Sequence, residues 1–331
     1  MKINRLVIEN FKSIERIELI EPNPFTVFVG PNGSGKSNIF EGLEFMNALT
    51  RIRFHEIVGS LFGGSESLSR KTVKDKPAYF EIDFDFIRLS EYYTFFPKQT
   101  ISYSSDLEDN RNRLLSDSST QIFNPSIHMF ENNFSRVFIK NERLVKFPLN
   151  DNQKLSLSAY NLEKVLKRIL SNETIRTEIF EWLELFVPGF KAIEVDDRNE
   201  LHWFENSSAD YFTKDLISDG TYNILALLTA VYQSDDQPQF LCIEEPENGL
   251  HPQVARELVD FFRIMCEERG HYIWLNTHSQ SMVSRVRAEE LVIVEKKDGA
   301  TQVRQFKGED FHGMRADEAW LTNSLGGGLA W

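Results

Sequence analysis

The sequence is poor in cysteine and has no long apolar run. Its two cysteines, Cys242 and Cys266, do not lie in a metal-binding spacing. Buried free thiols in a reducing compartment are the simplest interpretation. No apolar run approaches the ~20 residues that a membrane-spanning helix needs. We therefore expect a soluble, cytoplasmic protein with no membrane partner.

Positive charge is also scarce. The chain carries 50 Asp and Glu against 37 Lys and Arg, a formal net charge of −13. This balance argues against an extended basic face that grips DNA by charge alone, although a local basic patch or a basic partner is compatible with it. With 331 residues, 41% apolar and 26% charged, the chain has the composition of a globular protein of one or two domains.

What the sequence does contain is a phosphate-binding motif. Residues 30–37, Gly-Pro-Asn-Gly-Ser-Gly-Lys-Ser, match G-x-x-x-x-G-K-S. The apolar run 25–29 predicts a buried strand before the motif, and the spacing of Ile39, Leu43 and Met46 predicts an amphipathic helix after it. The succession of strand, glycine loop and helix distinguishes a P-loop from a glycine-rich turn without a ligand.

The residue types in this loop explain its chemistry. Gly33 and Gly35 allow the backbone to curl so that successive N–H groups face one anion, helped by the positive end of the following helix. Lys36 supplies a full positive charge for the terminal phosphates, and the hydroxyl of Ser37 is suited to ligate Mg²⁺.

A second motif is an apolar strand that ends in two acids, residues 240–245. In a magnesium-dependent ATPase the first acid, here Glu244, meets the metal, and the second, Glu245, polarises the attacking water. A strand followed by two acids is common in proteins without this role. Its place downstream of a P-loop and before Pro-Glu-Asn-Gly-Leu-His-Pro (246–252) favours the catalytic interpretation.

Two further stretches are candidate site segments. Asn-Thr-His-Ser (276–279) follows a predicted buried strand at 272–275, which places His278 at the ligand-binding edge of a parallel sheet as a candidate γ-phosphate contact. A histidine satisfied by its neighbours is the alternative. Residues 216–221 open a helix, and Ser218, Asp219 or Thr221 would serve as its N-cap. The same exposed N–H groups, with Ser218 and Gly220, would also hold an anion, which would then belong to a partner's nucleotide.

Hydrophobic periodicity predicts the organisation of the rest of the chain. We expect two antiparallel strands in 2–20, a half-buried strand at 79–86, a long polar loop at 104–121 and a return to strand at 135–147. A helical hairpin at 161–186, a β-hairpin at 190–204, an apolar helix at 221–233, a strand at 239–243, a helix at 254–265 and a closing β-hairpin at 292–306 should follow. The predicted domains are a split core (1–78 and 206–306), an inserted region (79–205) and a C-terminal tail (307–331).

The motifs occur together in a characteristic order: GPNGSGKSN at 30–38, ISDGT at 217–221, FLCIEEPENGLHP at 240–252 and NTHS at 276–279. The set resembles an ABC-type ATPase of the SMC/Rad50/RecF branch. It is most similar to the short bacterial "AAA family" ATPases of the AAA15/AAA21 type, which are related to the ATPase half of OLD-family nucleases. The resemblance implies an α/β fold, an ABC-ATPase head with a P-loop core, a mixed antiparallel β-subdomain and an inserted helical lobe.

The resemblance also implies roles for individual residues. Glu245 would be the general base and His278 the switch histidine, Ser37 and Glu244 would hold Mg²⁺, and Asn248 would lie in a loop that crosses a dimer interface. It further implies that Lys12 approaches the nucleotide. The ATP contacts would be Asn32, Gly33, Ser34, Gly35, Lys36, Ser37 and Asn38, and the signature acting in trans would be Ser218, Asp219 and Gly220.

Two features depart from the family pattern. The acid on the metal side is Glu244, where these ATPases usually carry Asp. No glutamine occurs between Ser37 and Lys98, so the glutamine that usually links Mg²⁺ to a neighbouring domain has no counterpart there.

These observations favour an ATPase whose homodimer, or higher oligomer, sandwiches ATP and switches a partner. A separate nuclease subunit is the expected effector and nucleic acid is a candidate ligand, in anti-phage defence or DNA repair. An ATP-binding scaffold with little turnover and the nucleotide-binding subunit of a transporter are alternatives. We do not expect a self-contained nuclease, because residues 279–331 are too few for a metal-binding nuclease module. The tail 319–331 is expected to pack on its own domain, with partner docking as the alternative.

Overall fold

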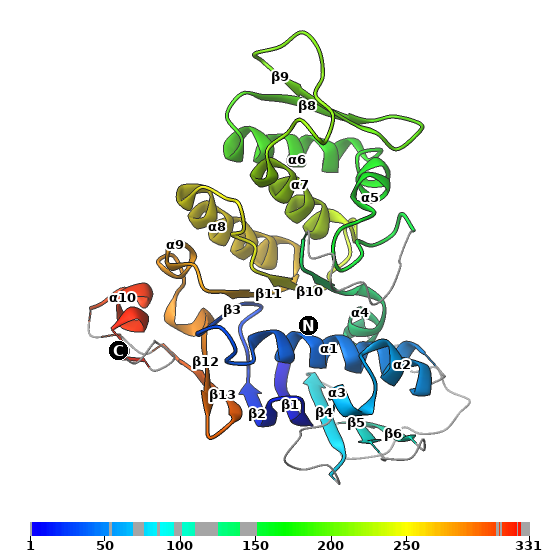
Figure 1. Cartoon of the computed structure of the whole chain (residues 1–331), viewed down its shortest axis with the longest axis vertical. Helices are drawn as coiled ribbons and strands as arrows, with labels where there is room; N and C mark the ends of the chain where they lie inside the picture. The colour runs from blue at the N-terminus through cyan, green and yellow to red at the C-terminus, as the bar shows by residue number, and fades with distance from the viewer. Residues whose placement is uncertain are drawn as a thin grey trace.

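Figure 1 shows the computed structural model of the chain. The structure describes residues 2–52, 55–68, 76–84, 87–95, 101–109, 125–139, 151–308, 311, 313–322 and 324–325. The strands are β1 (Ile3–Phe11), β2 (Ile14–Ile20), β3 (Phe25–Val29), β4 (Ala78–Phe84), β5 (Ile87–Phe95), β6 (Ile101–Asp109), β7 (Phe134–Val137), β8 (Phe190–Val195), β9 (Leu201–Glu205), β10 (Phe240–Glu244), β11 (Tyr272–Thr277), β12 (Leu291–Lys297) and β13 (Ala300–Gln305). The helices are α1 (Lys36–Arg51), α2 (His55–Leu61), α3 (Ser65–Leu68), α4 (Pro125–Asn133), α5 (Leu162–Ile169), α6 (Glu173–Phe186), α7 (Asp219–Tyr232), α8 (Pro252–Arg269), α9 (Gln280–Val283) and α10 (Ala316–Leu321), with a 3₁₀ turn at Ala288–Glu290.

One mixed sheet organises the molecule, in the order β6-β5-β4-β1-β2-β13-β12-β3-β11-β10-β7. Its parallel part, β12-β3-β11-β10-β7, is the P-loop core. In this part Glu244 pairs with Asn276, and Thr277 pairs with Val29. The register therefore brings the carboxyl ends of β3, β10 and β11 to one edge, where ligands bind in such sheets. The predicted fold class, an α/β fold with a P-loop core and a mixed sheet, is confirmed.

The rest of the sheet is an antiparallel arm made of β2, β1, β4, β5 and β6. It confirms the strand pair predicted in 2–20 and the strand predicted from residue 79. Hairpin β12–β13 joins the arm to the core, because β12 is parallel to β3 while β13 is parallel to β2.

Two predictions in this region were wrong in part. Residues 104–109 were expected to be an exposed loop, yet they belong to β6, which pairs with β5 along its length. An outermost strand has one free edge and tolerates polar residues, so its composition resembles that of a loop. The strand expected at 135–147 is β7, only Phe134–Val137, and it is a parallel edge strand of the core beside β10. Residues 110–121 and 140–147 lie outside the described residues.

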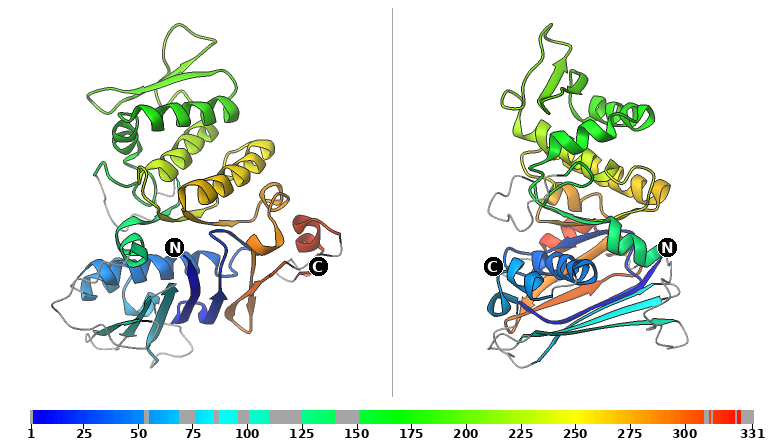
Figure 2. Two further views of the ribbon diagram at one scale, coloured as in Figure 1. Left: turned by 180° about the vertical axis from the view of Figure 1, so that it is seen from behind. Right: turned by 90° about the vertical axis from the view of Figure 1, so that its right-hand side faces the viewer.

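Helix α1 lies between the parallel core and the antiparallel arm (Figures 1 and 2). Phe40 meets Phe28 of β3 edge-on with ring centroids 5.3 Å apart, and Phe45 meets Phe80 of β4 at 5.6 Å. Such pairs add roughly 0.5–1.5 kcal/mol each beyond the burial of the rings. The helix that begins at the P-loop is thus fixed from two sides.

The opposite face of the parallel core carries the helical lobe, drawn in green and yellow above the sheet in Figure 1. Its apolar core joins β3, β10 and β11 to α5, α6, α7 and α8. The predicted helical hairpin (α5, α6), β-hairpin (β8, β9) and flanking helices are confirmed. At the other end of the chain α10 packs against α9, so residues 316–321 of the predicted tail contact their own core.

Among the described residues, every helix is too short or too polar to traverse a lipid bilayer. The division of the chain into a split core, an inserted region and a tail stays a prediction.

A buried histidine follows α8. His271 is fully buried, and its Nδ1 accepts a hydrogen bond from the backbone N–H of Gln239 at 3.3 Å. Burial, and to a smaller extent the guanidinium of Arg269, lowers the pKa of His271 from 6.5 to about 4. The imidazole is therefore neutral in the folded protein at neutral pH.

Because of His271, we expect the folded protein to lose stability in mild acid. Between pH 6.5 and about 4 it binds a proton in the unfolded chain but not in the folded one, so its contribution to stability is lost as the pH falls through this range. The shift corresponds to roughly 3 kcal/mol. Urea denaturation across this range should show a shallower loss of unfolding free energy for His271→Asn than for the wild type. His202→Asn, at a less buried histidine, is the control; equal slopes for the wild type and His271→Asn would contradict the prediction.

Candidate functional site

The P-loop runs from the end of β3 to the start of α1 and is packed tightly against the β12–β13 hairpin. Gly33 and Gly35 have φ of 79° and 104°, the left-handed region that glycine favours. A Cβ on Gly30 would lie 2.0 Å from the backbone oxygen of Val294, and one on Gly35 would lie 2.0 Å from Oγ1 of Thr301. The glycines are therefore required both by the turn and by the hairpin behind it.

A hydroxyl network holds the loop from behind. Oγ of Ser13 and Oγ1 of Thr301 are 2.6 Å apart, and Thr301 also donates to the backbone oxygen of Ser34 at 2.9 Å. Nδ2 of Asn38 donates to Ser13 at 2.7 Å. Asn38, predicted to bind ATP, thus has its side chain in this network. Thr301 was missed by the sequence analysis, because its contact with the loop spans 267 positions and carries no motif.

The side chain of Lys36 turns back toward the backbone of the P-loop itself. Its Nζ donates to the backbone oxygen of Gly30 at 2.6 Å and to that of Pro31 at 3.2 Å. Burial lowers the pKa of Lys36, and the carboxylates of Glu245, Glu247 and Glu244 oppose this shift. The P-loop thus holds a buried ammonium whose hydrogen-bond partners are backbone carbonyls.

Ser37 and Glu244 meet where α1 begins and β10 ends. Oγ of Ser37 donates to Oε2 of Glu244 at 2.6 Å, and Nδ2 of Asn276 donates to the same oxygen at 3.2 Å. The longer arm of glutamate, in place of the usual aspartate, does reach the P-loop serine. A hydroxyl and a carboxylate oxygen are hard donors of the kind Mg²⁺ takes, so these residues fit a magnesium ion.

The other oxygen of Glu244 is held by an arginine that the sequence analysis did not identify. Nε of Arg136, on β7, donates to Oε1 of Glu244 at 2.6 Å, and its Nη1 donates to Oε2 of Glu44 at 2.7 Å. The side chains of Arg136 and Glu244 are 2% and 1% exposed. Burial alone would lower the pKa of Arg136, but the neighbouring carboxylates raise it overall, so the guanidinium stays charged.

Glu245 lies at the rim of the site with its two predicted companions. Its backbone is left-handed, with φ of 47°, and its N–H donates to the backbone oxygen of Asn276 at 2.9 Å. Its Oε2 accepts from Nδ2 of Asn248 at 3.1 Å, and its Oε1 is 3.8 Å from Nδ1 of His278. The structure therefore brings together the predicted base, the predicted switch histidine and the predicted interface asparagine.

Glu247 ties this rim to the end of β11. Its Oε1 accepts from Oγ1 of Thr277 at 2.5 Å and from the backbone N–H of His278 at 3.2 Å. Burial raises the pKa of Glu247, while the hydrogen bond from Thr277 opposes the rise. Glu247 was missed although it lies inside the 246–252 stretch, because its burial depends on a strand thirty positions later.

The predicted signature residues lie at the start of α7. Ser218 and Asp219 are exposed, and Oγ of Ser218 caps the helix by accepting from the N–H of Thr221 at 3.1 Å. A Cβ on Gly220 would lie 2.5 Å from the backbone oxygen of Gly249. Within one chain, therefore, the signature packs against the loop 245–250.

Asn223, one turn into α7, strengthens this contact. Its Nδ2 donates to the backbone oxygens of Pro246 at 3.2 Å and Asn248 at 2.6 Å. Lys12, which the family resemblance placed near the nucleotide, pairs with Glu41 of α1 at 2.6 Å.

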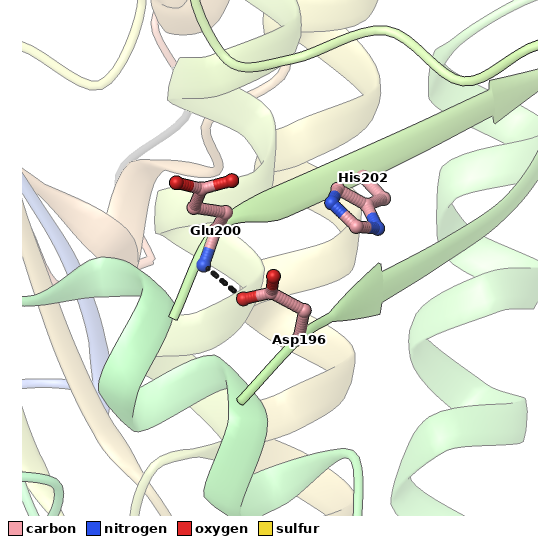
Figure 3. A group of neighbouring side chains, drawn as sticks. All are labelled: Asp196, Glu200 and His202. Carbon is pink, nitrogen blue, oxygen red and sulfur yellow. Dashed lines mark hydrogen bonds between the residues drawn. The ribbon is translucent and has the colours of Figure 1, made fainter. Parts of the chain in front are cut away.

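A second group of potential ligands lies at the turn between β8 and β9. Asp196, Glu200 and His202 have ligand atoms within 4.8 Å of one another. Figure 3 shows the backbone N–H of Glu200 donating to Asp196, which also accepts from the N–H of Arg198, both at 2.8 Å. The ring of His202 stacks on Tyr211 at 3.9 Å. These contacts make the group part of the hairpin turn.

Comparison with known proteins shows what the chain is similar to. A family model described as "AAA domain, putative AbiEii toxin, Type IV TA system" matches residues 25–284. The chromosome partition protein Smc of Methanocaldococcus jannaschii is 46% identical over 44 residues, which are 13% of this chain and 4% of that protein. The DNA replication and repair protein RecF of Geobacter sp. (strain M21) is 35% identical over 77 residues, 22% of this chain and 21% of that protein. The matched segments thus span about a fifth or less of these relatives.

Solved structures show the same fold over nearly the whole chain. An SMC head bound to the C-winged helix domain of ScpA superposes with a TM-score of 0.63 at 18% identity, covering 94% of this chain and 99% of that one. The SMC head domain from Thermotoga maritima gives 0.51 at 15% identity, covering 93% and 100%.

The contact between Gly220 and Gly249 predicts an unusual response to alanine. Alanine favours a helix over glycine by up to about 1 kcal/mol, yet Gly220→Ala should destabilise the protein by about 1–3 kcal/mol, because its Cβ meets a backbone oxygen. Urea denaturation measures the change. The control is Gly42→Ala in α1, whose Cβ would meet side chains instead of backbone: the flexible end of Ile8 at 3.0 Å and the ring of Phe11 at 3.6 Å. A Gly220→Ala protein as stable as the control would refute the packing.

Proposed function

Because the chain belongs to the AAA-domain family that matches residues 25–284 and is an ABC-type ATPase of the SMC/Rad50/RecF branch, we propose that it binds ATP with Mg²⁺, hydrolyses it, and acts as a dimer that switches a partner. In this proposal two copies enclose two nucleotides between them. Binding closes the pair of heads and hydrolysis reopens it.

One observation carries the proposal: the hydroxyl of Ser37 lies 2.6 Å from the carboxylate of Glu244, with Glu245 next in the chain. Ser37 and Glu244 would hold Mg²⁺, which when bound supplies charge stabilisation to the phosphates. The curled backbone of 32–37 and the start of α1 would hold the phosphate oxygens. The glycines at 30 and 35, where a Cβ would meet the hairpin, keep this cradle in shape.

The remaining side chains have separate tasks in this proposal. Lys36 exchanges the carbonyls of Gly30 and Pro31 for phosphate oxygens, which are better partners for a buried ammonium. Glu245 is exposed enough to meet water, with its side chain 31% exposed, and accepts a proton from the attacking water. Asn248 keeps the carboxylate of Glu245 in place, and His278 lies on its other side.

The exposure of the predicted signature supports the proposed dimer. Ser218 and Asp219 are exposed at the start of α7, so a second copy can contact them. Gly220 contacts Gly249 and Asn223 holds the backbone of Asn248, so a phosphate bound at the signature would act on the loop that carries Glu245. This contact would couple the two nucleotide sites of the dimer.

The partner is proposed on chemical and family grounds. The family description names a toxin–antitoxin system and the RecF relatives are named for DNA replication and repair. The partner in this proposal is a separate nuclease subunit that acts on nucleic acid in anti-phage defence or DNA repair. The name of the RecF relatives supports the nucleic-acid ligand, and the net charge of −13 favours contact with it through a partner.

Glu245→Gln should trap the closed dimer. The substitution keeps the size of the side chain and the bond from Asn248 but removes the base, so ATP binds and is not hydrolysed. Light scattering with ATP and Mg²⁺ should show a dimer that persists, while the wild type returns to monomer as phosphate is released. Lys36→Met is the control, and its dissociation constant for ATP should rise by a factor of about ten or more. A Glu245→Gln protein that stays monomeric excludes the sandwich; a wild type that binds ATP without releasing phosphate identifies a scaffold.

Two substitutions of Ser218 that differ in charge test the dimer, each made in a protein that also carries Glu245→Gln. Aspartate and asparagine both cap a helix as well as serine does, but only Ser218→Asp brings a negative charge to the phosphates of a partner copy. Ser218→Asp should bind ATP normally and fail to dimerise, whereas Ser218→Asn should dimerise within about tenfold of the parent affinity. Equal dimerisation of the two variants in light scattering would place the signature outside the interface.

A further inference from the structure

An ion triad buried beside the proposed magnesium site joins three elements. Arg136 of β7 donates to Glu244 at the end of β10 and to Glu44 of α1, at 2.6 and 2.7 Å. We infer that Arg136 is a positioning residue for Glu244: it fixes the carboxylate so that one oxygen faces Ser37, and thereby sets how tightly the site takes Mg²⁺. The inference rests on the proposed function, because it concerns the metal that the proposed ATPase needs.

The hydrogen bonds of Glu244 show how it is fixed. Its Oε1 is held by Arg136, and its Oε2 accepts from Ser37 and Asn276. With both oxygens engaged and the side chain 1% exposed, the carboxylate has one orientation before any ligand arrives. Partners of this kind, which hold a metal ligand from behind, change metal affinity by roughly 10–100-fold when they are removed.

The glutamate at position 244 explains why the triad is needed here. Glutamate has one more rotatable bond than the usual aspartate, so Glu244 needs a further contact to select a single rotamer. The glutamine that is usual in related ATPases has no counterpart between Ser37 and Lys98. Arg136 comes instead from the outermost strand of the core, where it pairs with Cys242.

The triad also links the metal side of the site to the elements around it. Glu44 lies on the helix that begins with Lys36 and Ser37, so the same guanidinium joins the P-loop helix to β10. Behind Arg136 lies a cavity of about 310 Å³, which Glu44, Arg51 and Lys154 also line. The smaller side chains of lysine and methionine therefore have space at position 136.

Another arginine in the chain provides a matched control. Arg263 bridges Glu290 and Asp260, each at 2.6 Å, and its side chain is 10% exposed. It lies on α8, over the ring of Phe25, which begins β3 at the end opposite the P-loop. Arg136→Lys and Arg263→Lys both keep the charge and lose the planar fork that spans two carboxylates.

The experiment measures binding of a fluorescent ATP analogue to the full chain, first in EDTA and then during a Mg²⁺ titration at fixed nucleotide. For Arg136→Lys we expect the Mg²⁺ concentration at half-saturation to rise about tenfold, while the dissociation constant in EDTA stays within about twofold of the wild type. Arg263→Lys should change neither value. Arg136→Met should shift the Mg²⁺ midpoint further than Arg136→Lys; if it does not fold, Arg136→Lys alone decides.

An unchanged Mg²⁺ midpoint in Arg136→Lys, or equal losses of binding with and without the metal, would overturn the inference and leave the triad a structural contact. A shift of the same size in Arg263→Lys would overturn it too. A wild type that binds no nucleotide would instead refute the proposed function, and this inference with it.

Discussion

The hydrogen bond between Ser37 and Glu244 joins positions 207 residues apart and defines the site. It exists because β3, β11 and β10 are neighbouring parallel strands whose carboxyl ends meet at one edge. The glycine loop after β3 then turns α1 so that its second residue faces the end of β10. Every other contact of the site either holds one of these two partners in place or extends the arrangement toward the rim.

Buried charge is distributed around this bond with a partner for each group. Lys36 is held by loop carbonyls, and Glu244 is held by Ser37, Asn276 and Arg136. An ion removed from water is stable only with such hydrogen bonds. The outer layer differs, because Glu245 is half-buried and His278 and Ser218 are exposed. In the proposed function the inner layer holds the ligand, and the outer layer meets water or another copy.

The sequence predicted the motif residues and the fold because those features are local. A glycine loop between a strand and a helix, or two acids at a strand end, is visible within ten residues. Arg136 was not predictable: it lies in a strand of four residues, and its partner is 108 positions away. Thr301 and Glu247 were missed for the same reason, since only the packed sheet brings them to the loop and to Thr277. Residues 104–109 of β6 were predicted to be part of a loop, because polar residues suffice at the edge of a sheet.

The account depends most on Ser37 and Glu244 acting together on one metal ion beside a bound nucleotide. A crystal structure with a non-hydrolysable ATP analogue and Mn²⁺, with the manganese located by its anomalous scattering, tests this directly. The account predicts one peak per chain between the Ser37 hydroxyl and the Glu244 carboxylate, next to the phosphates. A peak at Asp196, Glu200 and His202 alone, or a nucleotide bound with Glu244 still closed onto Ser37 and no metal between them, would contradict it.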